Sequence, residues 1–494
     1  MGASGAIAEY APLRHGNREP PMEYTRSTSR AHESLRTGLR LRAHDSREPV
    51  TVSIAIVGGG IAGCSAAWFL RQGLGEAAVI TVYERDHRVG GRLETIDVGG
   101  TQVEAGGTII HETNRFMAGF VDRLALERAE PHQRDVGAAE AVGVWDGRRL
   151  VFRTHTSTLR TRLSAVRRYG VTAPLRMQRA VARGVDQWNG VYAHLETGAG
   201  FVSPQAMCSK LGLAEMLEMD GRQWLSDSGV RGRFVDEYAS PVGRIMYGQD
   251  VSMHALATSI ALAGAGLAGK LFSVSGGNRL VCEGLLREAD ATLHSGSEVV
   301  GLSRAEPGFT VGLSNGRSQQ HDVVLLATPS GPSTLELNGV EPHASAVRPR
   351  PFQTTWATFV VGEPRSEWFG LTGTAALPDT LLTLEDDGIP FSSLGLVGET
   401  SEDLPVYKFF SREQLQDSLV DEIFPRHEAV EQIRWQAYPV LRPSTDLPPF
   451  RLTEGLYWVN AMEFAVSTME TETVAARNVA NLVMEERRTA AEGR

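Results

Sequence analysis

The sequence predicts an α/β fold that opens with a β-α-β unit near residue 52, and three observations support this prediction. Residues 54–63 read IAIVGGGIAG, an apolar β-branched run followed by glycines in G-x-G-x-x-G spacing. Apolar residues then recur at helical spacing over 66–70, and a second strand-like run, ITVY, ends directly before Glu84. This order of strand, glycine turn, helix and acidic residue is typical of a Rossmann-like dinucleotide-binding unit.

Each glycine of the turn has its own task in such a unit. We expect Gly58 to permit the tight turn, Gly60 to let the backbone approach a pyrophosphate, and Gly63 to let the helix pack against the sheet. The phosphates would lie at the helix N-terminus, where amides are unpaired and the helix dipole favours negative charge. Glu84 would then bind ribose hydroxyls.

The residues after Glu84 indicate which dinucleotide binds. Residues 85–92 read RDHRVGGR, and an acidic residue followed by a Gly-Gly-Arg turn resembles FAD-binding oxidases of the amine oxidase and desaturase type. The flexible turn at Gly91 would let Arg92 lie along the diphosphate, with its guanidinium fork on two oxygens. Arg85 is counted among the same cofactor-binding residues. A surface hairpin turn is the alternative explanation of these glycines.

Longer segments resemble the prenylcysteine oxidase family, flavoenzymes that cleave the thioether of farnesyl- or geranylgeranyl-cysteine. They are, in chain order, GGRLETIDVGGTQVEAGGTIIHETNRFMAGFVDRLAL at 90–126, YGQ at 247–249, GGNRLVCEGL at 276–285, VLLATP at 324–329, WQAYP at 435–439 and EGLYWVNAMEFAVSTMETETVAARNVANLV at 454–483. The resemblance therefore runs from about residue 52 to 484. It implies bound FAD, an apolar thioether substrate and O2 as electron acceptor. Because no cysteine lies near the C-terminal block, we expect the FAD to be noncovalent.

The flavin motifs fall in three separate stretches. We therefore expect a Rossmann-like FAD-binding domain assembled from discontinuous segments, with an inserted α+β substrate domain. The expected boundaries are 51–112, 272–330 and 445–488 for the FAD-binding domain, 113–271 and 331–444 for the substrate domain, and 1–50 and 489–494 for disordered ends. Expected elements are helices at 282–289 and 467–484, and strands at 298–302, 309–313, 323–327 and 456–459, with the middle strands continuing one sheet.

Two cofactor contacts follow from the resemblance. A valine at the position of Val299 pairs its backbone with adenine in related flavoproteins, and a glutamate at the position of Glu463 contacts the ribityl or phosphate region. A plain structural role as a sheet residue is the alternative for Val299.

The helix of the last block should direct its N-terminus at the flavin. Backbone amides near Thr468 and Met469 would then reach the phosphate or the pyrimidine edge of the ring and stabilise negative charge on reduced flavin. Ser467 followed three positions later by Glu470 also fits an ordinary capping box.

The resemblance implies that FAD carries the difficult step and that the chain mainly aligns the substrate. Hydride would pass from the carbon next to sulfur to flavin N5, water would add, and the hemithioacetal would collapse to an aldehyde and a thiol. Dioxygen would then reoxidise the flavin and yield H2O2. The sequence contains no H-E-x-x-H and no metal-ligand spacing, so we expect no metal.

Candidate catalytic residues lie in two of the family segments. In EAGGTIIH, Gly106 and Gly107 would let the backbone pass close to the isoalloxazine, and His111 would accept the proton of the adding water, although a structural histidine is the alternative. Gln249 would orient that water or hold the amino acid end of the substrate. Candidate walls of a prenyl pocket are Met246, Tyr247, Leu256, Trp435 and Tyr438, any of which alone could equally be core.

A missing lysine separates two kinds of donor. Many flavin amine oxidases place a lysine so that it holds a water at N5, but the corresponding stretch 352–361, FQTTWATFVV, contains none. This favours a thioether donor. Lys408, in VYKFFS, can enter from elsewhere, so the alternative stays open: a flavin oxidase or desaturase acting on another apolar amine, terpenoid or modified peptide. A flavin-binding protein without turnover is the third hypothesis.

Composition limits the partners and the location. The net charge is −10, from 59 acidic and 49 basic residues, which argues against a nucleic-acid partner. Three cysteines without paired spacing form no disulfide framework, and we expect Cys208 in a polar loop. The uncharged run 255–269 is too short to span a membrane, so we expect a buried helix, with peripheral membrane contact as the alternative. With no secretory signal visible, unlike lysosomal family members, we expect a cytoplasmic protein.

Overall fold

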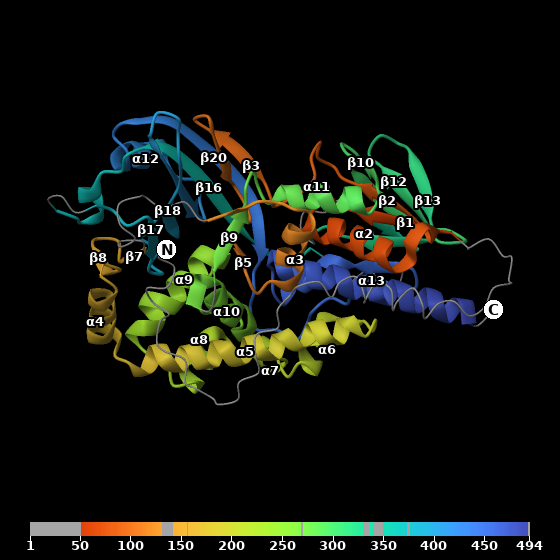
Figure 1. Ribbon diagram of the computed structural model, residues 1–494, viewed down its shortest axis with the longest axis horizontal. Coiled ribbons are helices and arrows are strands. Elements are labelled where there is room, and N and C mark those ends of the chain that lie inside the picture. Colours follow the sequence, from red (N-terminus) through yellow and green to blue (C-terminus); the bar gives the residue numbers. More distant parts are fainter. Residues whose placement is uncertain are drawn as a thin grey trace.

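The computed structural model describes residues 51–130, 142–155, 157–267, 270–329, 335–339, 349–372 and 376–492. The segment 1–50, expected to be disordered, lies outside these residues, as do 493 and 494. Two regions follow one another along the long axis of the molecule (Figure 1). One contains a parallel sheet with α2, α11 and α13, and the other contains a broad sheet with α4 and α8 to α10. The predicted α/β fold class is confirmed.

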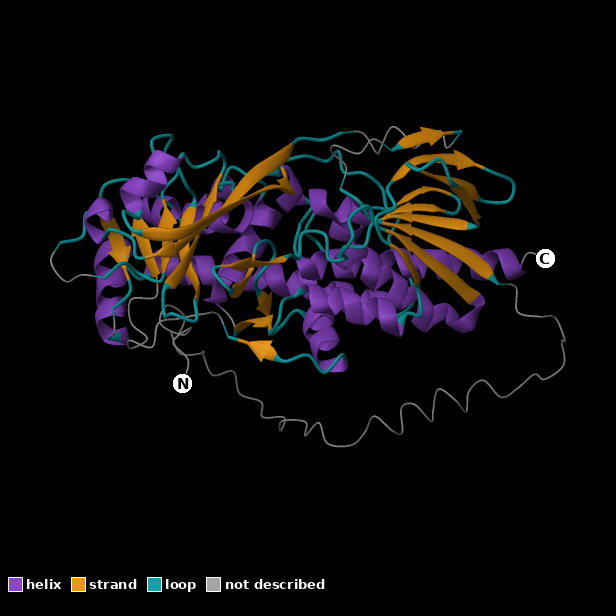
Figure 2. Ribbon diagram, turned by 90° about the horizontal axis from the view of Figure 1, so that it is seen from above, coloured by secondary structure: helices purple, strands orange, loops and turns teal. Residues whose placement is uncertain are grey.

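A six-stranded sheet forms the core of the first region. Its strands, in spatial order, are β10 (Thr292–His294), β2 (Ala78–Tyr83), β1 (Val52–Val57), β14 (Val323–Leu326), β22 (Leu456–Trp458) and β21 (Arg451–Thr453). The first five are parallel, and β21 is antiparallel to β22. Because β1 lies between β2 and β14, the turn after β1 is flanked by the carboxyl ends of strands that are far apart in sequence, as Figure 2 shows for the fan of strands.

Helices cover this sheet. They are α2 (Ile61–Leu74), α3 (Arg115–Arg123), α11 (Arg279–Glu288) and α13 (Met469–Glu492). Apolar residues of α2 and α13 pack in one buried cluster with β1, which is why the C-terminal helix lies beside the N-terminal unit. Residues 489–492, expected in a disordered tail, are helical because α13 continues to Glu492.

A separate four-stranded sheet carries Val299. It consists of β13 (Ser318–His321), β12 (Phe309–Leu313), β11 (Val299–Arg304) and β15 (Glu336–Asn338). The expectation that residues 323–327 continue this sheet is wrong. The fully buried strand β14 instead pairs with β1 in the parallel sheet.

The second region is built on a seven-stranded sheet. In spatial order its strands are β20 (His427–Pro439), β16 (Phe352–Gly362), β19 (Pro405–Ser411), β18 (Ser393–Glu399), β17 (Thr380–Thr383), β7 (Val142–Trp145) and β8 (Leu150–Arg153). Smaller sheets are β3 (Thr95–Val98) with β4 (Thr101–Glu104), and β5 (Ile110–His111) with β9 (Leu271–Val274) and β6 (Arg128–Ala129).

The remaining helices are α4 (Thr158–Tyr169), α5 (Thr172–Glu196), α6 (Pro204–Lys210), α7 (Glu215–Glu218), α8 (Gly221–Asp227), α9 (Ser240–Tyr247), α10 (Ala255–Leu262) and α12 (Asp417–Ile423). Buried residues of α6, α7 and the C-terminal part of α5 pack in the hydrophobic cluster of the first region. Nearly all of α10 is buried, as expected for the first part of the uncharged run, whereas Ala263 and Gly264 are half-buried and Ala265 is exposed. Cys208 is not in a polar loop but in α6, where burial raises the pKa of its thiol to about 12. No helix among the described residues is long and apolar enough to cross a membrane.

Candidate flavin and substrate site

The glycine turn, residues 58–63, is held by close backbone contacts. Gly58 has a φ of +109°, and a Cβ there would lie 2.4 Å from the carbonyl oxygen of Ala327. A Cβ on Gly63 would lie 2.0 Å from the carbonyl oxygen of Gly58. Gly60 precedes α2, so the unpaired amides of that helix lie directly after the turn. The geometry agrees with the turn expected at Gly58 and the close helix packing expected at Gly63, whereas the approach of Gly60 to a pyrophosphate stays a prediction.

Glu84 ties the end of β2 to this turn. Its carboxylate accepts a hydrogen bond from the amide of Gly59 at 2.7 Å and another from the amide of Asp86 at 2.9 Å, and the residue is buried. Each oxygen keeps a lone pair that can accept a further hydroxyl donor. The Arg85 side chain points away from the Glu84 carboxylate. It is 69% exposed, and its guanidinium lies 3.8 Å from the Asp86 carboxylate.

The Gly-Gly-Arg loop lies against the turn, but its arginine has protein partners. The amide of Gly90 donates to the carbonyl of Gly59 at 2.8 Å, and a Cβ on Gly91 would lie 3.5 Å from the Cα of Gly60. Arg92, expected along a diphosphate, donates instead to the carbonyl of Ala437 and to a carboxylate oxygen of Glu463, both at 2.6 Å. The chain thus supplies its own anion for this guanidinium.

Arg92, Glu463 and Glu472 form what we call the buried carboxyl cluster. Glu463 is fully buried and also accepts a hydrogen bond from Asn460 at 2.8 Å. Glu472, in the first turns of α13, is 4% exposed, and neither of its carboxylate oxygens has a hydrogen-bond partner among the described residues. Burial and the neighbouring Glu463 raise the pKa of Glu472 well above its usual value, and Arg92 opposes this shift.

Sequence reasoning missed Glu472. The available signal was a second acidic residue in a helix of mostly small and apolar residues, two positions after Glu470. The hydroxyl of Tyr247 is also buried without a partner in the described part of the chain, and Glu472 contributes to the raised pKa of that phenol after burial and Tyr438. Unsatisfied polar groups therefore gather between α9 and α13.

The Gly106–Gly107 segment is clamped from three sides. A Cβ on Gly106 would lie 1.9 Å from the carbonyl oxygen of Arg92, and the amide of Gly107 donates to that same oxygen at 3.0 Å. The Asn278 side chain donates to the carbonyls of Gly107 at 2.9 Å and Thr108 at 2.8 Å. This fixed backbone lies beside the N-terminus of α13, because a Cβ on Gly107 would lie 3.8 Å from the Met469 side chain.

Lys408 reaches this segment from a neighbouring strand. It lies on β19 opposite Phe359 of β16, the strand that has no lysine, and its ammonium donates to the Glu104 carbonyl at 3.0 Å and the Thr108 hydroxyl at 3.3 Å. Burial lowers the pKa of Lys408 to about 8, with Glu104 opposing the shift. Burial raises the pKa of the Glu104 carboxyl to about 7, against the Asn278 amide and Lys408. Long-range strand pairing brings this lysine in, which the local sequence could not show.

His111 ends β5 with one ring nitrogen occupied. Nδ1 accepts hydrogen bonds from the amide of Thr113 at 3.2 Å and from its hydroxyl at 2.7 Å. An amide only donates, so Nδ1 carries the lone pair and neutral His111 bears its hydrogen on Nε2. Nε2 is buried without a partner among the described residues, and burial lowers the pKa of the ring. In this arrangement His111 presents a donor and not a proton acceptor.

The α13 N-terminus is capped differently from the expected Ser467–Glu470 box. The Thr468 hydroxyl accepts a hydrogen bond from the Thr471 amide at 3.1 Å, and the Thr468 amide donates to the Thr471 hydroxyl at 2.8 Å. The Thr468 amide, expected to reach the flavin, is therefore occupied. Glu470 instead accepts from the amides of Phe116 at 2.9 Å and Met117 at 2.8 Å, and so caps α3.

The structure brings together three of the five expected wall residues. Met246, Tyr247 and Tyr438 lie in one hydrophobic cluster, and the two tyrosine rings meet edge to face with centroids 5.0 Å apart. Leu256 belongs to the cluster of the first region, and Trp435 packs among residues of β3 and β4. Val299, the expected adenine contact, is buried in β11.

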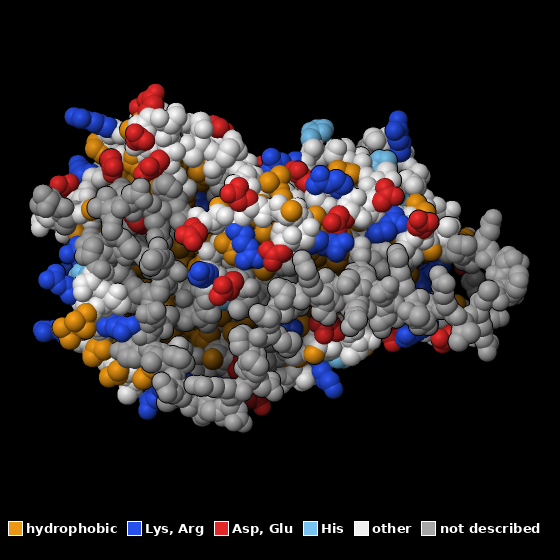
Figure 3. Space-filling view, in the orientation of Figure 1, with side chains coloured by type: hydrophobic (Ala, Val, Ile, Leu, Met, Phe, Trp, Pro, Cys, Tyr) orange, Lys and Arg blue, Asp and Glu red, His pale blue; other side chains and the backbone are white. Residues whose placement is uncertain are grey.

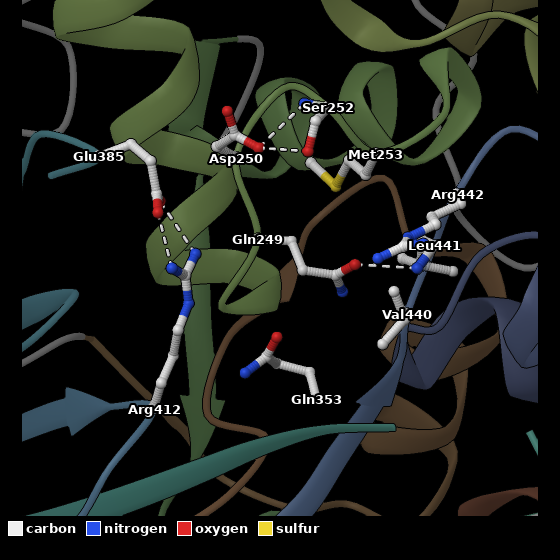
Figure 4. Close-up of a pocket in the computed structure, with 10 residues that line it drawn as sticks. All are labelled: Gln249, Asp250, Ser252, Met253, Gln353, Glu385, Arg412, Val440, Leu441 and Arg442. Carbon is white, nitrogen blue, oxygen red and sulfur yellow. Dashed lines mark hydrogen bonds and ion pairs between the residues drawn. The ribbon is translucent and has the colours of Figure 1, made fainter. Parts of the chain in front are cut away.

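Gln249 joins two of the family segments to each other. Its amide nitrogen donates to the carbonyls of Pro439 at 3.0 Å and Tyr247 at 3.3 Å, and its oxygen accepts from the amide of Leu441 at 2.8 Å. It borders a pocket of about 250 Å³ in which Arg412 pairs with Glu385 (Figure 4). Most of the residues that line this pocket are polar or charged, which does not suit an apolar chain.

Comparisons with known proteins agree with this geometry. The family model described as prenylcysteine lyase matches residues 152–492, and a model of an NAD(P)-binding Rossmann-like domain matches residues 56–124. Farnesylcysteine lyase of Arabidopsis thaliana is 35% identical over 449 residues, which cover 87% of this chain and 88% of that protein. Human prenylcysteine oxidase 1 is 31% identical over 458 residues, covering 87% of this chain and 88% of that protein.

Solved structures show the same architecture at lower identity. Cyclohexylamine oxidase from Brevibacterium oxydans matches with a TM-score of 0.60 and 16% identity, covering 89% of this chain and 100% of that one. Putrescine oxidase bound to putrescine matches with a TM-score of 0.58 and 14% identity, covering 88% of this chain and 99% of that one. At these identities the likeness shows the fold alone.

Proposed function

The chain belongs to the prenylcysteine lyase family, and from this premise we propose that it is an FAD-dependent oxidase that cleaves the thioether of a prenylcysteine-like substrate. The observation that carries the proposal is the extent of the match. It covers residues 152–492, and so includes most of the second region, Glu463 and Glu472 of the buried carboxyl cluster, and part of the nucleotide-binding sheet. The balanced reaction is thioether plus O2 plus water, giving aldehyde, thiol and H2O2.

The residues of the first region fit noncovalent FAD. The glycine turn and the amides of α2 would hold the diphosphate, Glu84 would accept the ribose hydroxyls, and Val299 would border the adenine. The unsatisfied oxygens of Glu472 are the feature of this chain that a bound ribityl chain would meet. All three cysteines are buried in helices, which supports a noncovalent flavin.

The chain has mainly to align the substrate. Bound flavin would supply a two-electron acceptor for the hydride on the carbon next to sulfur. Tyr247, Tyr438 and Met246 would hold the prenyl chain, because apolar contact converts binding energy into alignment of the reacting carbon. Gln249 would position these walls through its three backbone bonds, and His111 would donate through Nε2 to an oxygen or sulfur of the substrate.

One observation favours the alternative, an oxidase or desaturase of another apolar amine, terpenoid or modified peptide. Lys408 reaches the Gly106–Gly107 segment, so this chain does carry a buried ammonium where a lysine-held water would suit amine oxidation. The absence of a lysine from β16 is therefore weaker support for a thioether over an amine substrate than the sequence alone indicated.

Product analysis tests the proposal. The purified yellow enzyme is incubated in air with S-farnesylcysteine, and farnesal, free cysteine and H2O2 are measured. We expect the three products in equal amounts. If none forms while an apolar amine bleaches the flavin, the thioether proposal is wrong and the amine alternative stands.

A further inference from the structure

A long basic stretch stands out in this acidic protein. Residues 147–185 contain ten arginines and neither aspartate nor glutamate, whereas the whole chain carries a net charge of −10. The stretch includes β8, α4 and the start of α5. A charge separation of this kind creates a local positive field that attracts anionic surfaces.

The outer face of α4 adds exposed leucines to this charge. Leu159 is 75% exposed and Leu163 is 67% exposed, the two highest values among the large hydrophobic residues described. They lie four positions apart and so share one helix face. Arg160 and Arg167, seven positions apart, border that face, and neither has an ion-pair partner in the part of the chain that the structure describes.

The surface view shows the same pattern. Hydrophobic side chains gather at the lower left of the molecule, over the position of α4, with Lys and Arg side chains beside them (Figure 3). On the other side of α4, Arg168 donates two hydrogen bonds to the Glu237 carboxylate, at 2.5 and 2.9 Å. The pairing of Arg168 fixes the helix on the protein and leaves the opposite face outward.

From these observations we propose that α4 docks this protein on an anionic membrane surface, with Leu159 and Leu163 entering the headgroup boundary and Arg160 and Arg167 contacting lipid phosphates. Apolar side chains flanked by arginines fit a lipid interface. A nucleic acid would satisfy the arginines but offer nothing to the two leucines.

The inner face of α4 connects the surface to the substrate walls. Ala165 and Tyr169 pack against the hydrophobic cluster that also holds Tyr247, Met246 and Tyr438. A prenyl chain dissolved in a bilayer would therefore meet the protein on the side of the proposed pocket. This link to substrate delivery rests on the proposed function, whereas docking itself does not.

Vesicle co-sedimentation of the full flavoprotein tests docking. Vesicles of phosphatidylcholine, with and without phosphatidylserine, are mixed with wild type, R160Q/R167Q and L159S/L163S. We expect binding only with phosphatidylserine, about thirtyfold weaker for R160Q/R167Q, from a factor of about five per arginine, and at least tenfold weaker for L159S/L163S. The matched controls R426Q/R434Q and V79S/L293S, which change exposed residues elsewhere, should bind like wild type.

Three results would overturn the proposal. The first is equal vesicle binding by all variants. The second is a wild-type dimer, found by light scattering without vesicles, that L159S/L163S dissociates, since the face would then join two copies of the chain. The third is tight RNA binding with no vesicle binding.

Turnover separates this inference from the proposed function. L159S/L163S should oxidise a water-soluble short-chain thioether at the wild-type rate and a vesicle-dissolved farnesyl thioether more slowly. If wild type oxidises neither thioether yet still binds vesicles, the proposed function fails while docking stands.

Discussion

The glycine turn and the buried carboxyl cluster are joined by the short loop from Gly90 to Arg92, yet they differ in how their polar groups are satisfied. In the turn, the amide of Gly90 donates to the carbonyl of Gly59, Glu84 accepts two amides, and two glycines leave no room for a Cβ. In the cluster, neither the Glu472 carboxylate nor the nearby Tyr247 hydroxyl has a hydrogen-bond partner among the described residues. The polar groups of the turn are thus satisfied by the chain itself. In the cluster, Glu472 either binds a ligand or stays protonated.

The largest effect should come from filling the turn. In G63A the new Cβ would lie 2.0 Å from the backbone oxygen of Gly58, so β1 and α2 must separate. We expect an unfolding free energy lower by more than about 3 kcal/mol and a protein purified without flavin. Thermal melts and the absorbance of the purified protein check this.

The matched control is G119A in α3, where a Cβ would meet nothing within 4 Å. An alanine there should raise stability by about 0.5–1 kcal/mol, because glycine is the poorer helix former. If G63A retained flavin and melted like G119A, the close packing assigned to the turn would be wrong.

Lys408 gives the next largest effect, through pH. Its folded-state pKa of about 8 is below the unfolded value of about 10.4, so the folded protein binds fewer protons between these pH values. Wild-type stability should therefore rise by about 3 kcal/mol from pH 8 to above pH 10, relative to K408M. Denaturant unfolding of both proteins across that range measures the difference. If the unfolding free energies of wild type and K408M changed with pH in the same way, the lowered pKa of a buried Lys408 ammonium would be contradicted.

K408M also separates the two donor classes. Thioether oxidation needs no lysine-held water, so we expect kcat for S-farnesylcysteine to change less than about threefold, within the reach of altered packing. A loss of a hundredfold or more would favour the amine alternative. The control K270M changes an exposed lysine and should leave both profiles unchanged.

A smaller effect is expected at the incomplete cluster. The folded-state pKa of Glu472 is raised, so the unfolded chain releases its proton first and stability is lost as pH rises above the unfolded pKa. In the flavin-free protein, E472Q should match wild type near pH 4 and melt roughly 2–4 °C higher at pH 8. E485Q, at an exposed position of the same helix, should show no such gain. A lower melting temperature for E472Q at pH 8 would mean that the carboxylate has a partner.

The smallest effect tests the revised helix cap. Thr468, and not Ser467, exchanges hydrogen bonds with Thr471, so T468A should cost about 1 kcal/mol and S467A close to none. Denaturant unfolding of the two variants measures the difference. A larger loss of stability in S467A than in T468A would instead support the Ser467 cap expected from the sequence.

Local features could be predicted from sequence, because their geometry is set within a few residues. The turn at Gly58, Gly60 and Gly63, the position of Glu84 after β2 and the buried helix α10 follow from spacing and composition. The family segments also indicated that Tyr247 and Tyr438 belong together, 191 positions apart, and their rings do meet.

Partners set by long-range packing could not be predicted. Arg92 meets Glu463 across 371 positions, Lys408 meets Glu104 across 304, and Glu470 caps a helix 353 positions earlier. In each case a neighbouring strand or helix supplies the partner, which no local pattern encodes. Long-range packing also explains why the cap was predicted one residue too early. The Glu470 carboxylate binds the amides of Phe116 and Met117 in α3, so Thr471 and not Glu470 exchanges hydrogen bonds with the residue that caps α13.

Anaerobic mixing with isotopically labelled substrate tests the central claim most directly. The oxidised flavoprotein is mixed with S-farnesylcysteine carrying either hydrogen or deuterium on the carbon next to sulfur, and the loss of flavin absorbance is followed in a single turnover. Our account predicts complete bleaching that deuterium slows severalfold, followed by release of farnesal. Bleaching at the same rate with both substrates, or no bleaching, would contradict hydride removal from that carbon.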